Sequence, residues 1–125
     1  MSFSNIARVR EIIDANGPRL RLSIERHALE TLVRLERMDL LGKTSATLDV
    51  YGTELLCGFV VAARLTNCDG LADERVEGPH GAIFSITSPP DRRIEIRQGT
   101  GRTLSVPASL WDRLFAELCI VSAHG

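Results

Sequence analysis

The residues whose types and spacing most suggest chemistry lie in the stretch RIEIRQGTGRTLSVP, residues 93–107, around the run Gly99-Thr100-Gly101-Arg102. A phosphate-binding P-loop requires a strand, the pattern G-x-x-x-x-G-K-[ST], and a helix whose N-terminus faces the anion. Here the Lys is missing, the glycine spacing is wrong, and the following TLSV is typical of a strand. A dinucleotide-binding fingerprint fails as well, since only G-x-G is present. We therefore expect a hairpin turn in which glycine supplies a positive φ.

Four arginines surround this predicted turn and are candidates for binding an anion or an acidic partner: Arg92, Arg93, Arg97 and Arg102. Alternation along a strand places Arg93 and Arg97 on one face together with Glu95. Arg102 follows on the returning strand, close to Arg97 across the turn. Guanidinium groups suit fork-like binding of phosphate or carboxylate. The alternative is an ordinary solvated face that Glu95 partly neutralises.

The segment GTGRTLSVPASLWDRL also resembles the hairpin-and-proline segment of MazE-like antitoxins and other AbrB-type swapped-hairpin proteins. The matching positions are Gly99 and the run Val106-Pro107-Ala108-Ser109-Leu110. The resemblance implies DNA binding by a dimer, with Arg97 and Arg102 as its basic turn residues. It covers only sixteen of 125 residues, and it stands at the C-terminal end of this chain rather than at the N-terminal end. We therefore argue fold and function from the residues themselves.

A second group of charged residues gathers in the polar stretch CDGLADERVEGPHG, residues 68–81. Its acidic members are Asp69, Asp73, Glu74 and Glu77, and His80 follows. Their spacing matches neither an EF-hand nor a His-x-x-x-His metal pattern, so we expect no metal site. A solvated acidic loop remains, which can serve as an interaction loop for an Arg-rich or Lys-rich partner.

Residues for nucleophilic catalysis are sparse. No G-x-S-x-G elbow occurs, and the three cysteines form neither a C-x-x-C pair nor a Cys/His run. Cys57 and Cys119 lie in apolar runs and are interpreted as buried, inert side chains. We identify no catalytic residue and no cofactor, and the sequence leans away from an enzyme.

Composition describes a globular chain of one domain, residues 1–125, with 44% hydrophobic and 25% charged residues. The net charge of −1 argues against a protein that coats nucleic acid or membrane over its whole surface. Residues 44–91 carry two basic and seven acidic side chains, whereas residues 92–125 carry five and three. The apolar-rich stretch 55–63 is too short to span a bilayer. The start of the chain has no apolar targeting core, so we expect a cytoplasmic protein.

The first third of the chain predicts two helices. One covers residues 5–16, with an apolar stripe and Asn16-Gly17-Pro18 as its stop. The other covers residues 24–41, with Leu29 and Met38 among the residues facing the core and Gly42 at its end. Residues 45–67 fit either a buried helix or a hairpin of two strands, and we favour the helix.

The last third predicts a three-stranded antiparallel meander over residues 82–87, 92–98 and 103–106, followed by a helix that starts at Pro107. The expected fold class is therefore α+β: N-terminal helices, a three-stranded antiparallel β-meander, and a C-terminal helix packed on the sheet.

These observations favour a small non-enzymatic regulatory or inhibitor protein that binds a macromolecular partner, most readily a protein, and of a kind that phages and mobile elements encode. One alternative is a nucleic-acid-binding regulator that uses the Arg-rich hairpin. Another is a small enzyme or enzyme subunit with a pocket between sheet and helices. A homodimer is consistent with the open sheet edges, and we expect no membrane partner.

Overall fold

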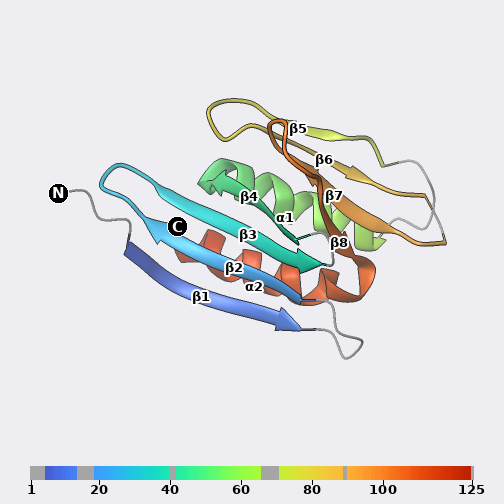
Figure 1. Ribbon diagram of the computed structural model, residues 1–125, viewed down its shortest axis with the longest axis horizontal. Coiled ribbons are helices and arrows are strands. Elements are labelled where there is room, and N and C mark those ends of the chain that lie inside the picture. Colours follow the sequence, from blue (N-terminus) through green and yellow to red (C-terminus); the bar gives the residue numbers. More distant parts are fainter. Residues whose placement is uncertain (1–4, 14–18, 40–41, 66–70, 89, 125) are drawn as a thin grey trace.

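A computed structural model describes residues 5–13, 19–39, 42–65, 71–88 and 90–124. Their order is four strands and a helix, followed by four more strands and a second helix (Figure 1). The first unit comprises β1 (Asn5–Ile13), β2 (Arg19–Arg26), β3 (Thr31–Asp39), β4 (Gly42–Asp49) and α1 (Val50–Leu65). The second comprises β5 (Glu74–Val76), β6 (Ala82–Ile86), β7 (Arg93–Arg97), β8 (Leu104–Pro107), the 3-10 turn η1 (Ala108–Leu110) and α2 (Trp111–His124).

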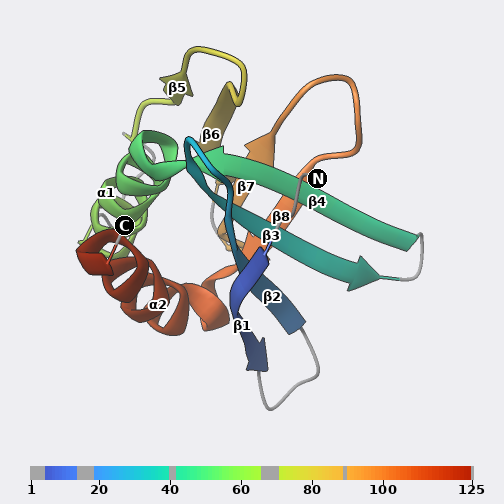
Figure 2. The same ribbon diagram turned by 90° about the vertical axis from the view of Figure 1, so that its left-hand side faces the viewer.

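Each unit forms an antiparallel meander, β1-β2-β3-β4 in the first sheet and β5-β6-β7-β8 in the second. Both helices lie behind the strands in Figure 1 and to one side of them in Figure 2. The last strands of the two sheets, β4 and β8, approach each other without pairing. Each sheet therefore has an inner face toward the helices and an outer face away from them.

The core lies between the inner faces and the helices. Period-two alternation buries Leu20 and Leu22 in β2 and Val33 and Leu35 in β3. The second sheet and the helices contribute the largest set of fully buried side chains: Leu56, Phe84, Ile94, Ile96, Leu104, Leu110, Leu114 and Leu118. Trp111 is also buried, and its indole N–H donates to the carbonyl of Val106 at 2.9 Å.

The predicted N-terminal helices are wrong, since the segments 5–13, 19–26 and 31–39 are strands. In RLRLSIER the apolar residues Leu20, Leu22 and Ile24 alternate with polar ones, which is the period of a strand, whereas in TLVRLERMD only Val33 and Leu35 keep that alternation. Leu, Arg and Glu favour helices locally, but cross-strand pairing outweighs that weak preference. Two residues expected in the core are instead exposed, Leu29 at 98% and Met38 at 67%.

The three-stranded meander is also wrong, because the second sheet has a fourth strand. β5 comes from the stretch predicted as a polar loop and pairs with β6. The strands β6, β7 and β8 lie within about a residue of the segments expected for the meander, and a C-terminal helix follows.

The ambiguous segment 45–67 is divided between two elements. Residues up to Asp49 complete β4, and Val50–Leu65 form α1. The change occurs at Asp49, whose Oδ1 accepts the Gly52 N–H at 2.7 Å and so caps the helix. In the described part of the chain, no helix combines the length and the apolarity needed to cross a membrane.

Candidate functional site

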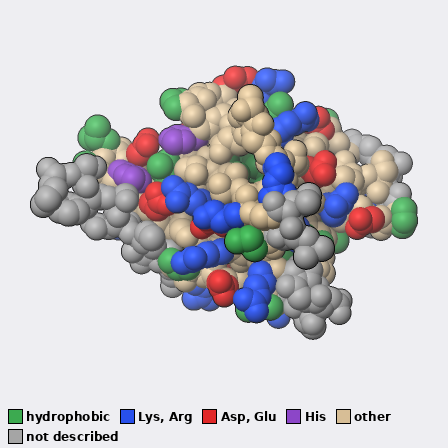
Figure 3. Space-filling model, in the orientation of Figure 1, with side chains coloured by type: hydrophobic (Ala, Val, Ile, Leu, Met, Phe, Trp, Pro, Cys, Tyr) green, Lys and Arg blue, Asp and Glu red, His purple; other side chains and the backbone are tan. Residues whose placement is uncertain are grey.

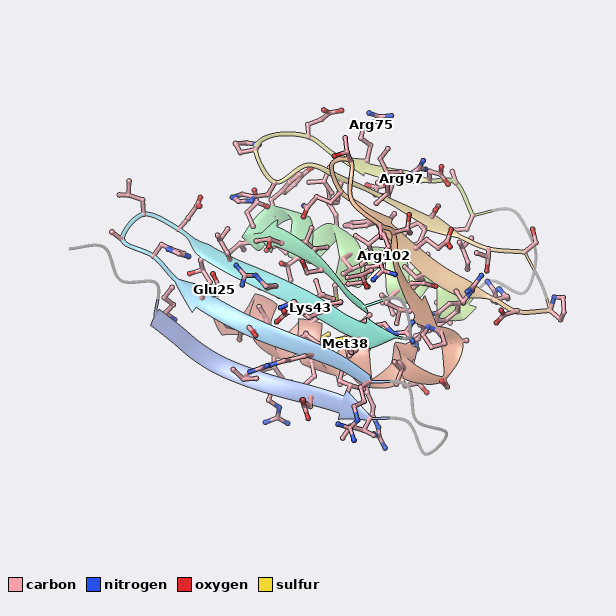
Figure 4. All side chains as sticks on the ribbon, in the orientation of Figure 1. Glu25, Met38, Lys43, Arg75, Arg97 and Arg102 are labelled. Carbon is pink, nitrogen blue, oxygen red and sulfur yellow. The ribbon has the colours of Figure 1, made fainter. Side chains whose placement is uncertain are left out.

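The outer face of the second sheet carries the two arginines that best qualify as a binding site. In the strand register, Arg75 of β5 stands opposite Ile83 of β6, and Ile83 stands opposite Arg97 of β7. Both arginines are exposed, and Figure 4 shows them on β5 and β7, the strands on either side of β6. Since adjacent strands lie about 4.8 Å apart, the backbones of the two arginines are separated by roughly 10 Å. An apolar side chain is therefore flanked by two guanidinium groups.

A hollow of about 280 Å³ lies at this position. Its lining residues come from β5, β6, β7 and the turns that join them: Arg75, Val76, Glu77, Gly78, Gly81, Ala82, Ile83, Arg97 and Gly99. The β5–β6 connection can close only with glycine at two points. Gly78 has φ +107°, and a Cβ at Gly81 would stand 2.9 Å from the carbonyl oxygen of Val76.

The arginine side chains on this face differ in whether they have an ion-pair partner. Within the described residues, the side chains of Arg75 and Arg97 form no hydrogen bond or ion pair, whereas the Arg93 guanidinium lies 3.5 Å from the carboxylate of Asp91. Glu95 stands in the next row of the sheet, opposite Ser85 and Ser105. The face thus offers two guanidinium groups with their donors open to solvent, which is the arrangement that binds carboxylate or phosphate.

Gln98, directly after β7, ties this region to the first sheet. Its side-chain amide accepts the Thr47 N–H at 2.8 Å and donates to the Thr47 carbonyl at 2.7 Å. The same Nε2 lies 3.3 Å from the carbonyl oxygen of Gly81. One side chain therefore satisfies the edge of β4 and holds the β5–β6 turn that lines the hollow.

The four predicted arginines do not form one group. Arg93 and Arg97 share the outer face. Arg92 instead points to the helical side, where it donates to the Ala63 carbonyl at 3.2 Å and lies 5.5 Å from the Trp111 ring. Arg102 reaches from the β7–β8 turn to the start of β4, 3.7 Å from a Cβ built on Gly42, and has an interaction within the fold. The expected positive φ is found at Gly99, at 63°.

The acidic interaction loop is likewise divided. Asp69 lies outside the described residues, and Asp73 is exposed just before β5. Glu74 begins β5, and Glu77 directly follows it at the rim of the hollow. Arg75 was missed as a site residue because β5 is only three residues long and shows too little alternation to be recognised inside a polar stretch.

No group of three or more His, Cys, Asp or Glu side chains in the described ranges is arranged to hold a metal ion. Two further hollows have other linings. One of about 410 Å³ lies beside Arg64, Arg92 and Trp111, and one of about 560 Å³ lies beside His27 and Tyr51.

No protein-family model matches the chain, and no curated protein sequence matches it.

Proposed function

We propose that this protein is a small non-enzymatic regulatory or inhibitor protein that binds an acidic segment of a protein partner through the outer face of its second sheet. The observation that carries the proposal is the row Arg75–Ile83–Arg97, in which two guanidinium groups without partners among the described residues flank an apolar side chain in a hollow. Protein interfaces are enriched in arginine and commonly combine apolar contact with charge-assisted hydrogen bonds at the margin.

The chemistry of this face favours protein over nucleic acid. Duplex DNA is typically bound through about 6–10 phosphate contacts, and single strands are bound by aromatic stacking. The strands of the outer face of the second sheet carry three arginines, Arg75, Arg93 and Arg97, beside one acidic residue, Glu95, and Glu77 lines the hollow after β5. Arg92 and Arg102, which the Arg-rich hairpin hypothesis requires, lie elsewhere. Two free guanidinium groups match the carboxylates of a short acidic segment better than a phosphate backbone.

The test is fluorescence anisotropy with a labelled peptide rich in Glu and Leu, its Gln-for-Glu analogue, and labelled single- and double-stranded DNA. We expect the acidic peptide to bind and the Gln analogue to bind weakly. The Arg75→Ala/Arg97→Ala double variant should weaken peptide binding by about 10-fold or more, since each charge-assisted hydrogen bond contributes on the order of 1.5–3 kcal/mol.

The matched control is Arg21→Ala. Arg21 is also an exposed arginine on an outer face, but it stands on the first sheet opposite Glu36 and Glu11. Its removal should leave peptide affinity unchanged. Equal peptide affinity in the double variant and the native protein would reject the proposal. Steeply salt-dependent DNA binding that the double variant abolishes would instead support the nucleic-acid hypothesis.

A further inference from the structure

The helical side of the molecule brings together two cysteines that are far apart in sequence. Cys57 of α1 and Cys119 of α2 have their Sγ atoms 3.8 Å apart, although 62 positions separate them along the chain. Cys119 is exposed and Cys57 is half-buried. The sequence predicted both as buried and inert, and the exposure of Cys119 corrects that interpretation. The two thiols are free and in contact.

We infer that Cys57 and Cys119 are a thiol pair that closes into a disulfide between α1 and α2 when a small oxidising disulfide, of the glutathione class, is present. The two helices that carry the pair lie to one side of the strands (Figure 2), on the inner side of the second sheet. The inference is therefore independent of the proposed peptide-binding function.

The exchange proceeds in two balanced steps. The Cys119 thiolate attacks one sulfur of the external disulfide, forms a mixed disulfide and releases one small thiolate. The Cys57 thiolate then attacks the Sγ of Cys119 and releases the second small thiolate. The two protein thiols lose two protons to the released thiolates, and the external disulfide takes the two electrons.

Accessibility sets the order of these steps. The exposed Cys119 can meet a dissolved oxidant, whereas Cys57 is partly covered. Burial, together with the hydrogen bond and charge of Cys119, raises the pKa of Cys57 from 9.0 to about 11. Cys57 is thus a poor first nucleophile but is already placed to resolve a mixed disulfide on its neighbour. Closing the bond requires the sulfur atoms to approach from 3.8 Å to about 2.05 Å.

Closing a loop of this length restricts the unfolded chain, so the oxidised protein should melt on the order of 10 °C higher than the reduced protein. The experiment equilibrates the full chain in mixtures of reduced and oxidised glutathione. Remaining thiols are then alkylated, and cross-linked peptides are mapped by mass spectrometry after proteolysis. We expect a Cys57–Cys119 cross-link within one chain, with Cys68 still alkylated.

Three variants control the assignment. Cys68→Ser, at a position outside the described residues, should still form the cross-link. Cys57→Ser should stop at a glutathione adduct on Cys119, and Cys119→Ser should keep Cys57 as a free thiol. Glutathione adducts without a cross-link, or a cross-link that contains Cys68, would overturn the inference. If peptide binding fails and the cross-link forms, only the proposed function is rejected.

Discussion

The outer faces of the two sheets have similar strand architecture but differ in how many of their charged side chains form ion pairs. On the first sheet, alternation places four basic and four acidic side chains outward: Arg19, Arg21, Arg34 and Lys43 with Glu11, Glu25, Glu36 and Asp49. Two close ion pairs lie among them, Arg34–Glu25 at 3.1 Å and Lys43–Glu36 at 2.6 Å. On the second sheet, three arginines face one glutamate, and two of the arginines have no partner among the described residues.

This contrast shows why the number of arginines does not identify a binding face. In the space-filling view of the strand side, basic side chains extend over both sheets with acidic ones among them (Figure 3). Only strand register and ion-pair distances distinguish the first sheet, whose outward charges include two close ion pairs, from the second, where Arg75 and Arg97 have no partner among the described residues. On the first sheet the guanidinium of Arg34 stabilises a buried carboxylate, whereas on the second sheet Arg75 and Arg97 remain available to another molecule.

The largest expected effect compares Arg34→Ala with Arg97→Ala. Glu25 is only 6% exposed, so removing Arg34 leaves its buried carboxylate without a guanidinium partner, with the Nε2 of His27 3.4 Å away. We expect Arg34→Ala to lower the free energy of unfolding by about 2 kcal/mol, less than for a fully buried pair because water reaches Arg34. Arg97→Ala should change it by less than about 0.5 kcal/mol.

Urea denaturation of both variants measures the difference directly. Arg34→Lys is the charge-conserving control and should recover part of the loss, since an ammonium group can still approach Glu25. Equal destabilisation by Arg34→Ala and Arg97→Ala would show that the two faces do not differ in how their arginines are used.

The second expected effect concerns Gln98, whose side chain connects the second sheet to β4 of the first. Gln98→Leu keeps a side chain of similar size but leaves the Thr47 N–H and C=O at the β4 edge without their side-chain partner. We expect a loss of about 1–2 kcal/mol in the free energy of unfolding. Hydrogen exchange of the Thr47 amide should accelerate in the variant. An unchanged exchange rate at this amide would contradict the role assigned to Gln98.

A third and smaller effect tests the division among the predicted arginines. Because Arg92 contacts Trp111 and the Ala63 carbonyl, Arg92→Ala should lower the free energy of unfolding by about 1 kcal/mol. It should leave acidic-peptide affinity unchanged. Fluorescence of the single tryptophan reports the local change. Weakened peptide binding in this variant would show that Arg92 contributes to the peptide-binding face, contrary to its position on the helical side.

The sequence predicted best where turns and alternation are strong. RRIEIRQ alternates strictly between glycine and proline breakers, so β7 and the outward direction of Arg93 and Arg97 could be predicted. The N-terminal strands were predicted as helices because helix-forming Leu, Arg and Glu occupy them. The alternation of Leu20, Leu22 and Ile24 is the one local sign of a strand there, and pairing with neighbouring strands outweighs the helix preference. Arg75 and the contact between Cys57 and Cys119 depend on residues brought together from distant segments, which local patterns cannot reveal.

The last expected effect comes from the helical side and concerns stability at alkaline pH. The pKa of Cys57 is raised to about 11 in the folded protein from an ordinary value of 9.0. Between these values the unfolded chain has released the thiol proton while the folded chain retains it. The free energy of unfolding should therefore fall as pH rises from 9 to 11. Below that range the thiol is protonated in both states and causes no pH dependence. Cys57→Ser, with both proteins kept under a reducing phosphine, should lose less stability over the same interval. Identical pH slopes in urea denaturation would mean that burial and Cys119 do not hold the proton on Cys57.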